Sequence, residues 1–360
     1  MANRAEELDP DVCCIDDLKS RASVQLPQMY RDYYNEGPMD LLTLRDNEAA
    51  FDRYKIRPKI LVDVNYIDTS SELFGTKVSF PLGLSPTAMH KLAHPDGEVA
   101  TSRAAAATGI SMVLSSYSTC SIEDATAQGL EIPYAMQMCV LKDRKITLHL
   151  EARRGGCKAL FLSVDNAVLG KRLNEFRNKF ELPVDMTWPN ILSHSSVHSD
   201  GVYYDAGMNL EETIPWLRDN SNLQIWLKGV NRADDVQLAI KLGLDGIVIS
   251  NHGGRQLDGV PATLDVLREC APIATGKVHL AIDSGIRRGS DISKALALDA
   301  SHCFIGRAAV WGLAKGVELG IKILLQELRI TMALAGCRSI KDIDSSFLSV
   351  LQPNGILAKL

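Results

Sequence analysis

Residues 245–258 combine a short apolar run with polar side chains that can do chemistry. The β-branched run 247–249 predicts a buried strand, and the chain then turns through His252 and two glycines to Arg255. The imidazole of His252 can accept a proton, and the guanidinium of Arg255 can bind a carboxylate. The glycines let the backbone approach a ligand closely. Taken alone, His252 could instead be a structural histidine in a turn.

The composition is that of an ordinary globular protein. The chain has 360 residues, 46% hydrophobic and 23% charged, and its formal net charge of -5 gives no reason to expect a nucleic acid or an anionic membrane as partner. The eight cysteines show no Cys-x-x-Cys spacing, which favours reduced thiols in an intracellular compartment. The polar N-terminus and the lack of long apolar runs predict neither secretion nor a membrane span.

The last three residues, Ala358-Lys359-Leu360, are a small-basic-leucine sequence of the kind that the peroxisomal import receptor reads. We therefore expect a peroxisomal protein. Three residues can also match by chance, and the expected location is then the cytoplasm.

Apolar runs and helix-like segments alternate along most of the chain. Counting from Pro81 gives eight strand-like runs, at 81–85, 111–115, 134–139, 159–164, 224–228, 246–250, 278–282 and 302–305. Helix-like segments lie at 100–108, 122–128, 146–155, 233–242, 290–298 and 317–334. The runs do not alternate polar with apolar residues, so their strands should be parallel and covered by helices. The pattern predicts an α/β fold of the TIM (β/α)8 barrel type.

We expect one domain, because no Pro/Ser/Gly-rich linker divides the chain. Residues 1–75 should be an N-terminal helical extension, with short helices within 13–36 and a polar link over 45–75. The barrel should span 76–315, followed by a C-terminal helix and tail over 316–360. The long insert after strand four, about 166–223, predicts an active-site loop or lid. The sequence has no Gly-x-Gly-x-x-Gly, so a Rossmann fold has no support.

Polar residues at the ends of the eight runs are the candidates for a barrel active site, because such sites form at the C-terminal ends of the strands. They include Thr87, Ser115, Gln137, Asp165, Lys228, His252, Asp283 and Arg307. No set of histidines and carboxylates has metal-ligand spacing, so we expect no metal.

The loops after strands seven and eight are suited to a phosphate. They contain Asp283 to Gly289 and Gly306-Arg307, which offer glycine amides and arginines. A phosphorylated cofactor is therefore indicated. The alternative is that these arginines only make salt bridges at the surface.

These motifs together resemble the FMN-dependent α-hydroxy acid oxidases and dehydrogenases, such as glycolate oxidase and lactate oxidase. The resemblance runs from Leu26-Pro27 to the segment at 336–339. The motifs that carry it are Pro86-Thr87-Ala88-Met89, His94-Pro95-Asp96-Gly97-Glu98, Ser250 to Asp258, Asp283 to Gly289, and Phe304-Ile305-Gly306-Arg307.

The resemblance implies an FMN site and a substrate site. FMN would contact Pro86, Thr87, Ala88, Ser115, Gln137, Ser163, Lys228 and Ser250 through its ring and ribityl chain, and Asp283, Ser284, Gly285, Ile286, Arg287, Gly306 and Arg307 through its ribityl hydroxyls and phosphate. His252 would be the base and Asp165 its partner. Arg172 and Arg255 would clamp the substrate carboxylate, and Tyr33 would hydrogen-bond it. The base takes the hydroxyl proton if a hydride leaves, or the α-proton if a carbanion forms.

Three positions depart from the family pattern. Cys139 stands where the family usually has a tyrosine, Tyr117 where glycolate oxidases tend to have tryptophan, and Ser284 where a glycine is common. Cys139 and Tyr117 are expected in the substrate pocket, so a substrate bulkier than glycolate is predicted. A water in place of the missing phenol is the alternative for Cys139.

We therefore predict that the protein is an FMN-dependent oxidase of a 2-hydroxy acid, with O₂ as acceptor and H₂O₂ as product. We expect it to assemble as a homotetramer or octamer. One alternative keeps the flavin and the base but oxidises a C–H or C–N bond next to the carboxylate of a bulkier specialised-metabolite acid. Another is a flavin-binding protein without catalysis.

Overall fold

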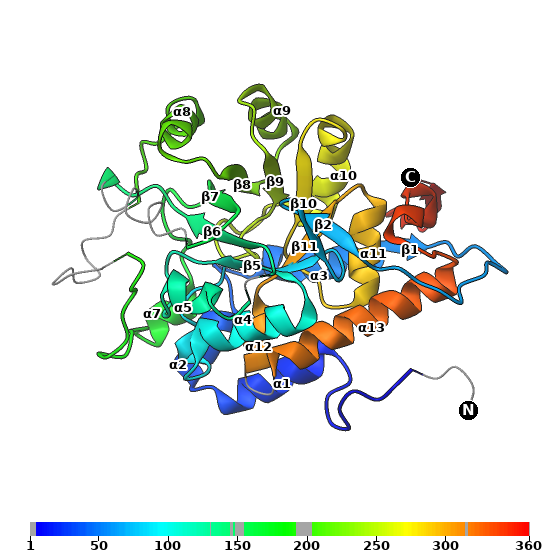
Figure 1. Ribbon diagram of the computed structural model, residues 1–360, viewed down its shortest axis with the longest axis horizontal. Helices are drawn as coiled ribbons and strands as arrows, with labels where there is room; N and C mark the ends of the chain where they lie inside the picture. The colour runs from blue at the N-terminus through cyan, green and yellow to red at the C-terminus, as the bar shows by residue number, and fades with distance from the viewer. Residues whose placement is uncertain are drawn as a thin grey trace.

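The computed structural model describes residues 5–129, 131–144, 147, 155–191, 204–313 and 316–359. Eight parallel strands close into a barrel, so the predicted TIM barrel is confirmed (Figure 1). In chain order the strands are β4 (Leu82–Leu84), β5 (Ser111–Leu114), β6 (Tyr134–Met138), β7 (Ala159–Ser163), β8 (Gln224–Val230), β9 (Gly246–Ile249), β10 (His279–Ile282) and β11 (His302–Ile305). Most are buried along their whole length, as expected of parallel strands covered on both faces.

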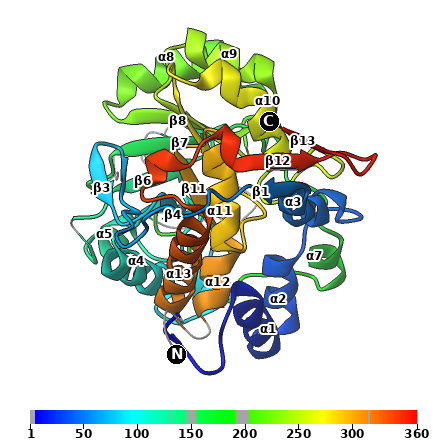
Figure 2. The same ribbon diagram turned by 90° about the vertical axis from the view of Figure 1, so that its right-hand side faces the viewer.

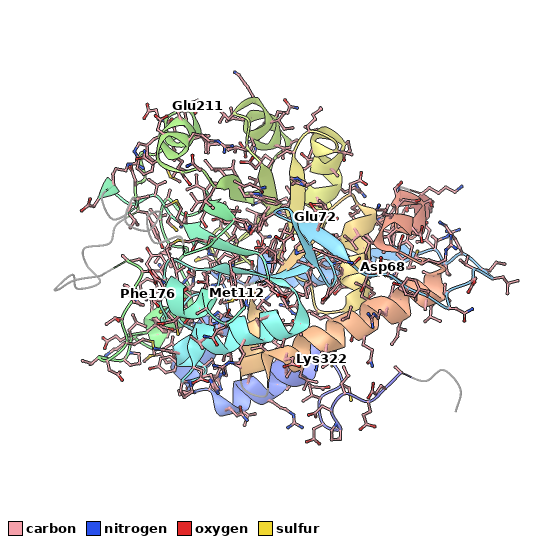
Figure 3. All side chains as sticks on the ribbon, in the orientation of Figure 1. Asp68, Glu72, Met112, Phe176, Glu211 and Lys322 are labelled. Atoms are coloured by element: carbon pink, nitrogen blue, oxygen red, sulfur yellow. The ribbon has the colours of Figure 1, made fainter. Side chains whose placement is uncertain are left out.

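Helices surround the barrel. They are α4 (Gly97–Thr108), α5 (Ile122–Thr126), α8 (Leu210–Asn220), α9 (Ala233–Lys241), α10 (Thr263–Ala274), α11 (Gly289–Ala297), α12 (Arg307–Leu313) and α13 (Val317–Ala335). Met112 of β5 lies among the inner side chains, whereas Lys322 of α13 is at the surface (Figure 3). None of the described helices is both long and apolar enough to cross a membrane.

Two expectations for the middle of the chain fall partly outside the described residues. The predicted helix at 146–155 is one, and the polar part of the insert, at 192–203, is the other. The described part of the insert contains α7 (Leu173–Arg177) as well as α8.

The prediction of a polar link over 45–75 holds for residues 57–70, which contain no helix or strand, and is wrong at the two ends of the range. The N-terminal helices α1 (Ile15–Gln25) and α2 (Gln28–Asn35) are followed by α3 (Leu42–Arg53), and then by β1 (Tyr54–Ile56) and the hairpin of β2 (Ser71–Leu73) and β3 (Thr76–Val78). The inner face of α3 is half polar, with Thr43 and Asn47 beside Ala50 and Phe51. Thr43 and Asn47 are buried because they hydrogen-bond the segment after β9. The hydrophobic pattern of an amphipathic helix is therefore weak in the sequence.

The C-terminal tail returns to the N-terminal part of the chain (Figure 2). After short 3₁₀ turns at Ile340–Asp342 and Ser345–Phe347, β12 (Leu348–Leu351) pairs antiparallel with β1 and with β13 (Leu357–Lys359). Ala358 and Lys359 of the expected peroxisomal signal lie in β13, and Leu360 lies outside the described residues. The peroxisomal location stays a prediction.

Aromatic side chains fill the interior of the barrel. The ring of Trp226 stacks on Phe161 at 5.5 Å between centroids and on His279 at 5.8 Å on its other side, and Phe74 meets it edge-on. Gly246 pairs with Trp226 in the barrel register, and a Cβ there would collide with the indole. The glycine thus gives the indole room to reach His279.

Gly246→Ala should destabilise the protein by about 1–3 kcal/mol, because the added methyl overpacks the barrel interior. The measurement is the midpoint of chemical denaturation. In a Trp226→Phe background the same change should cost less, because the smaller ring leaves space for the methyl. An equal cost in both backgrounds would contradict this account of Gly246.

Candidate active site

A cavity of about 900 Å³ opens at the C-terminal ends of the barrel strands. Its lining contains nearly every residue expected at the site, brought there from all eight strand ends. Asp165 and Ser250 are not in the lining. They lie behind it, Asp165 in contact with His252, and Ser250 in contact with His252 and Lys228.

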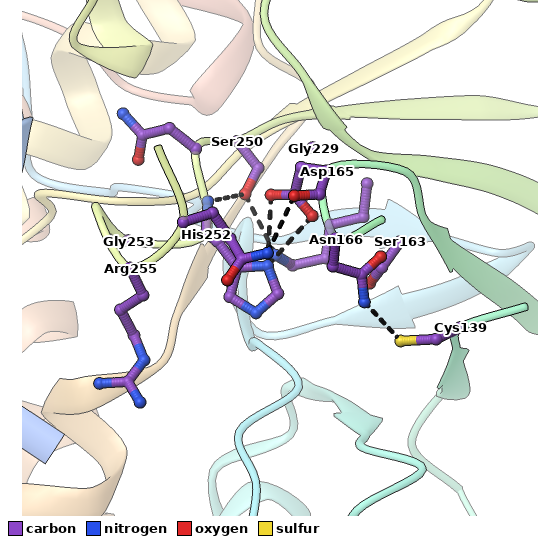
Figure 4. A network of polar contacts seen from close by, with 12 residues as sticks. Cys139, Ser163, Asp165, Asn166, Gly229, Ser250, His252, Gly253 and Arg255 are labelled. Carbon is purple, nitrogen blue, oxygen red and sulfur yellow. Dashed lines mark hydrogen bonds and ion pairs between the residues drawn. The ribbon is translucent and has the colours of Figure 1, made fainter. Parts of the chain in front are cut away.

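His252 and Asp165 form a close pair (Figure 4). Nδ1 of His252 lies 3.1 and 3.2 Å from the two carboxylate oxygens of Asp165. A carboxylate at this position favours the proton on Nδ1 and leaves Nε2 as the acceptor. Burial lowers the pKa of His252, and this outweighs the opposing effect of Asp165. Burial raises the pKa of Asp165, but His252 and Lys228 outweigh it and hold that pKa below its ordinary value. A neutral imidazole that contacts a carboxylate through Nδ1 can accept a proton at Nε2.

The backbone around this pair is specialised. His252 has a left-handed backbone with φ 57°, and a Cβ on Gly229 would lie 2.6 Å from the carboxyl carbon of Asp165. Gly229 also falls in the register shift between Lys228 and Val230 of β8. A bulge of this kind re-aims the neighbouring side chains.

Lys228 is a buried cation with nearby anionic and hydroxyl partners. Its Nζ lies 3.2 Å from a carboxylate oxygen of Asp283 and donates to the hydroxyl of Ser250 at 3.1 Å. Burial lowers the pKa of Lys228, but Asp283 and Asp165 outweigh burial and raise it. The lysine is therefore positively charged at neutral pH.

Gln137, Cys139 and Asn166 form a polar group at the ends of β6 and β7. The amide of Gln137 donates to Cys139 Sγ at 3.1 Å and to Ser163 at 3.1 Å. Asn166 Nδ2 donates to the same sulfur at 2.8 Å, a contact drawn in Figure 4. Burial raises the pKa of the Cys139 thiol to about 11, so the thiol is neutral. Because the sulfur accepts two N–H groups, its own S–H remains as a donor.

The region after β10 and β11 carries an excess of positive charge. Burial, followed by the charges of Arg255 and Arg287, lowers the pKa of Arg307 well below its ordinary value. The guanidinium of Arg307 donates to the backbone carbonyls of Tyr34, Gly253 and Glu36, and Nε of Arg287 is buried without a hydrogen-bond partner among the described residues. Two buried guanidiniums beside the amides of a glycine loop fit a phosphate. The residues present therefore fit a phosphorylated cofactor.

Arg172 and Arg255 meet at one side of the cavity, as expected. Nε of Arg172 donates to the backbone oxygen of Arg255 at 3.2 Å, and the guanidinium of Arg255 lies 4.7 Å above the ring of Tyr33. Glu175 contacts both guanidiniums. Tyr117, also in the lining, packs edge-on against Trp188 and Tyr204, at 5.3 and 6.4 Å between centroids. The cavity lining thus contains both a pair of guanidiniums and a cluster of aromatic rings.

Several residues of the site were not predicted from the sequence. They are Asn166, Glu175, Trp188, Tyr204 and Gly229. Asn166 directly follows Asp165, so extending the strand-four end by one residue would have included it. The others lie in the insert or inside a strand, where no local pattern marks them.

The structure shows no metal centre among the residues it describes, since no group of three or more His, Cys, Asp or Glu side chains there could hold a metal ion.

Comparison with known proteins identifies the relatives of this chain. Residues 22–350 match the family described as FMN-dependent dehydrogenase. The oxidase FUB9 of Gibberella moniliformis is 48% identical over 97% of this chain and 94% of its own length, and human 2-hydroxyacid oxidase 1 is 43% identical over 94% and 96%. Among solved structures, mandelate oxidase with benzoyl-formic acid has a TM-score of 0.86 at 31% identity, covering 97% of this chain and 100% of that one. A soluble mutant of the (S)-mandelate dehydrogenase from Pseudomonas putida has a TM-score of 0.87 at 34% identity, covering 94% and 99%.

Ser284 offers a test of the loop geometry. It has a left-handed backbone with φ 78°, its hydroxyl accepts from Gly253 N at 3.0 Å, and it donates to Asp283 at 2.8 Å. Ser284→Ala should destabilise the protein by about 1–3 kcal/mol in chemical denaturation, because the N–H of Gly253 loses its partner.

Ser284→Gly is the matched control. It loses the same bonds but relieves a backbone that costs a residue with a side chain about 1–2 kcal/mol, so it should be more stable than the alanine variant. A glycine variant less stable than the alanine variant would show that the left-handed backbone is not strained.

Proposed function

The chain belongs to the FMN-dependent dehydrogenase family, with FMN as its cofactor. We propose that it oxidises a 2-hydroxy acid to the 2-oxo acid, with O₂ as the electron acceptor. The overall reaction is R–CHOH–COO⁻ + O₂ → R–CO–COO⁻ + H₂O₂. The observation that carries the proposal is the His252–Asp165 pair in the same cavity as the two guanidiniums of Arg172 and Arg255.

The proposed roles follow from charge and position. Arg172 and Arg255 bind the substrate carboxylate, with Tyr33 beside them, and so orient the α-carbon toward His252. Nε2 of His252 takes the proton that leaves the substrate, and Asp165 stabilises the imidazolium that results. When bound, FMN supplies the electron acceptor.

Most of the residues proposed to hold FMN line the rest of the cavity, and Ser250 lies behind the lining in contact with Lys228. Those for the ring and ribityl chain are Pro86, Thr87, Ala88, Ser115, Gln137, Ser163, Lys228, Ser250 and Asp283, and those for the phosphate are Ser284, Gly285, Ile286, Arg287, Gly306 and Arg307. The positive charge of Lys228 stabilises negative charge on a flavin ring beside it.

A bulkier substrate is the second candidate, and it keeps the same base. The small Cys139 and the aromatic group of Tyr117, Trp188 and Tyr204 support it. The structural relatives include an oxidase and a dehydrogenase of mandelate, a 2-hydroxy acid with a phenyl side chain. An acid from specialised metabolism, oxidised at a C–H or C–N bond next to its carboxylate, belongs to this candidate.

A peroxisomal location and assembly as a homotetramer or octamer are further parts of the proposal.

Anaerobic mixing of the FMN-loaded protein with 2-hydroxy acids of increasing side-chain size should bleach the flavin, and O₂ should then release one H₂O₂ per substrate. His252→Asn should slow the bleaching by about 10²–10⁴-fold, because the base is gone, while FMN content is retained. His94→Asn, a histidine outside the cavity, should keep the rate. A flavin that no 2-hydroxy acid bleaches would overturn the first candidate, and one that no acid of any kind bleaches would indicate a flavin-binding protein without catalysis.

The pH dependence of kcat/KM should report His252. Because burial holds the pKa of His252 below its ordinary value, the neutral imidazole predominates at neutral pH. Activity should fall only when acid protonates the imidazole, with an inflection below the ordinary histidine pKa. Asp165→Asn removes a charge that raises this pKa, so it should move the inflection to lower pH and reduce the rate. An inflection above the ordinary histidine pKa would contradict the assignment of His252 as the base.

A further inference from the structure

Glu175 places a carboxylate inside the cavity that the proposed reaction does not use. It lies on α7, and its Oε1 is 3.1 Å from Nη1 of Arg172 and 3.4 Å from Nη2 of Arg255. The side chain is 22% exposed, and those of Arg172 and Arg255 are 11% and 14% exposed. The three charges therefore interact where water screens them only in part.

Glu175 sets the charge of the clamp. Arg172, Arg255 and Glu175 together carry one excess positive charge, which one substrate carboxylate would neutralise. Arg307 donates to the same backbone carbonyl of Glu36 as Arg255, so its charge lies beside this group, and the proposal assigns that charge to the phosphate of FMN. The guanidinium of Arg255 also donates to the backbone carbonyls of Tyr33 and Glu36, which fixes it in place.

The other cations in the described lining of the cavity have partners of their own. Lys228 pairs with Asp283, Arg287 pairs with Glu48, and Arg307 donates to backbone carbonyls beside the expected phosphate position. The lining also contains Tyr117, Trp188, Leu182 and Met186, together with the exposed carboxylate of Glu181. No further arginine or lysine stands in the described part of this lining.

We propose that Glu175 is a specificity-determining residue that limits the site to acids with one carboxylate and an uncharged side chain. The inference rests on the proposed function, because it takes the arginine pair as the clamp for the reacting carboxylate. A second carboxylate on a short side chain would lie within several ångströms of Glu175. At that distance like charges in a partly buried site repel strongly enough to weaken binding by about tenfold or more.

The test compares two ligands of one shape and different charge. 2-Oxoglutarate and its 5-methyl ester are analogues of the proposed product, so each can be titrated into the FMN-loaded protein while the flavin absorption spectrum is followed. The wild-type protein should bind the ester about tenfold or more tightly than the diacid. Glu175→Gln should reduce this ratio to about threefold or less, because the amide keeps the shape and removes the charge. Glu211→Gln, at an exposed carboxylate outside the cavity lining, should leave the ratio unchanged.

Two results would overturn the proposal: equal affinity of the wild-type protein for both ligands, or a Glu175→Gln protein that keeps the wild-type ratio. Glu175→Asp should keep the preference for the ester, which separates the charge from the shape of the side chain. If Glu175→Gln does not retain FMN, the ratio of the two affinities in the wild-type protein and in Glu175→Asp still tests the proposal. Because binding of a 2-oxo acid needs no turnover, the result of this titration is independent of the peroxide assay that tests the proposed function.

Discussion

The contact between His252 Nδ1 and the carboxylate of Asp165 is the interaction on which the site depends. The two residues follow β9 and β7, which are not neighbours in the barrel, because β8 lies between them. The contact forms because β8 has a glycine at position 229 and an irregular register there, which leaves room for the carboxylate. Lys228, on the same strand, lies near Asp165 and Asp283. Strand β8 therefore positions both the His252–Asp165 pair and the buried cation.

Charge balance is the second constraint on the cavity. Its lining contains five cations, Arg172, Lys228, Arg255, Arg287 and Arg307. Burying so many like charges is costly unless each finds an anion. Asp283, Glu48 and Glu175 partner some of them. The remaining positive charge lies at the arginine clamp and at the loops after β10 and β11, which meet where Arg255 and Arg307 donate to the same carbonyl of Glu36. Two anions on separate molecules fit this arrangement, a carboxylate at the first place and a phosphate at the second.

Cys139 departs from the family pattern, and its hydrogen bonds show how the cysteine fits its surroundings. A cysteine at position 139 is not merely a smaller side chain, because Gln137 and Asn166 both donate to its sulfur. These bonds orient the thiol and leave its proton as a weak donor. Nearby, Tyr117, Trp188 and Tyr204 pack edge-on and present flat apolar surface.

The amino-acid sequence by itself determined the barrel, the strand ends and the main site residues. Short apolar runs that do not alternate, repeated eight times between helix-like segments, favour buried parallel strands, and the polar residues that end such strands share one face. The tertiary structure alone decided the helical state of residues 42–53, the space that Gly229 provides and the position of Glu175 between two arginines. Each of these depends on contacts between segments far apart in the chain. Thr43, for example, is buried because the segment after β9 provides its hydrogen-bond partners, and no pattern within residues 42–53 contains that information.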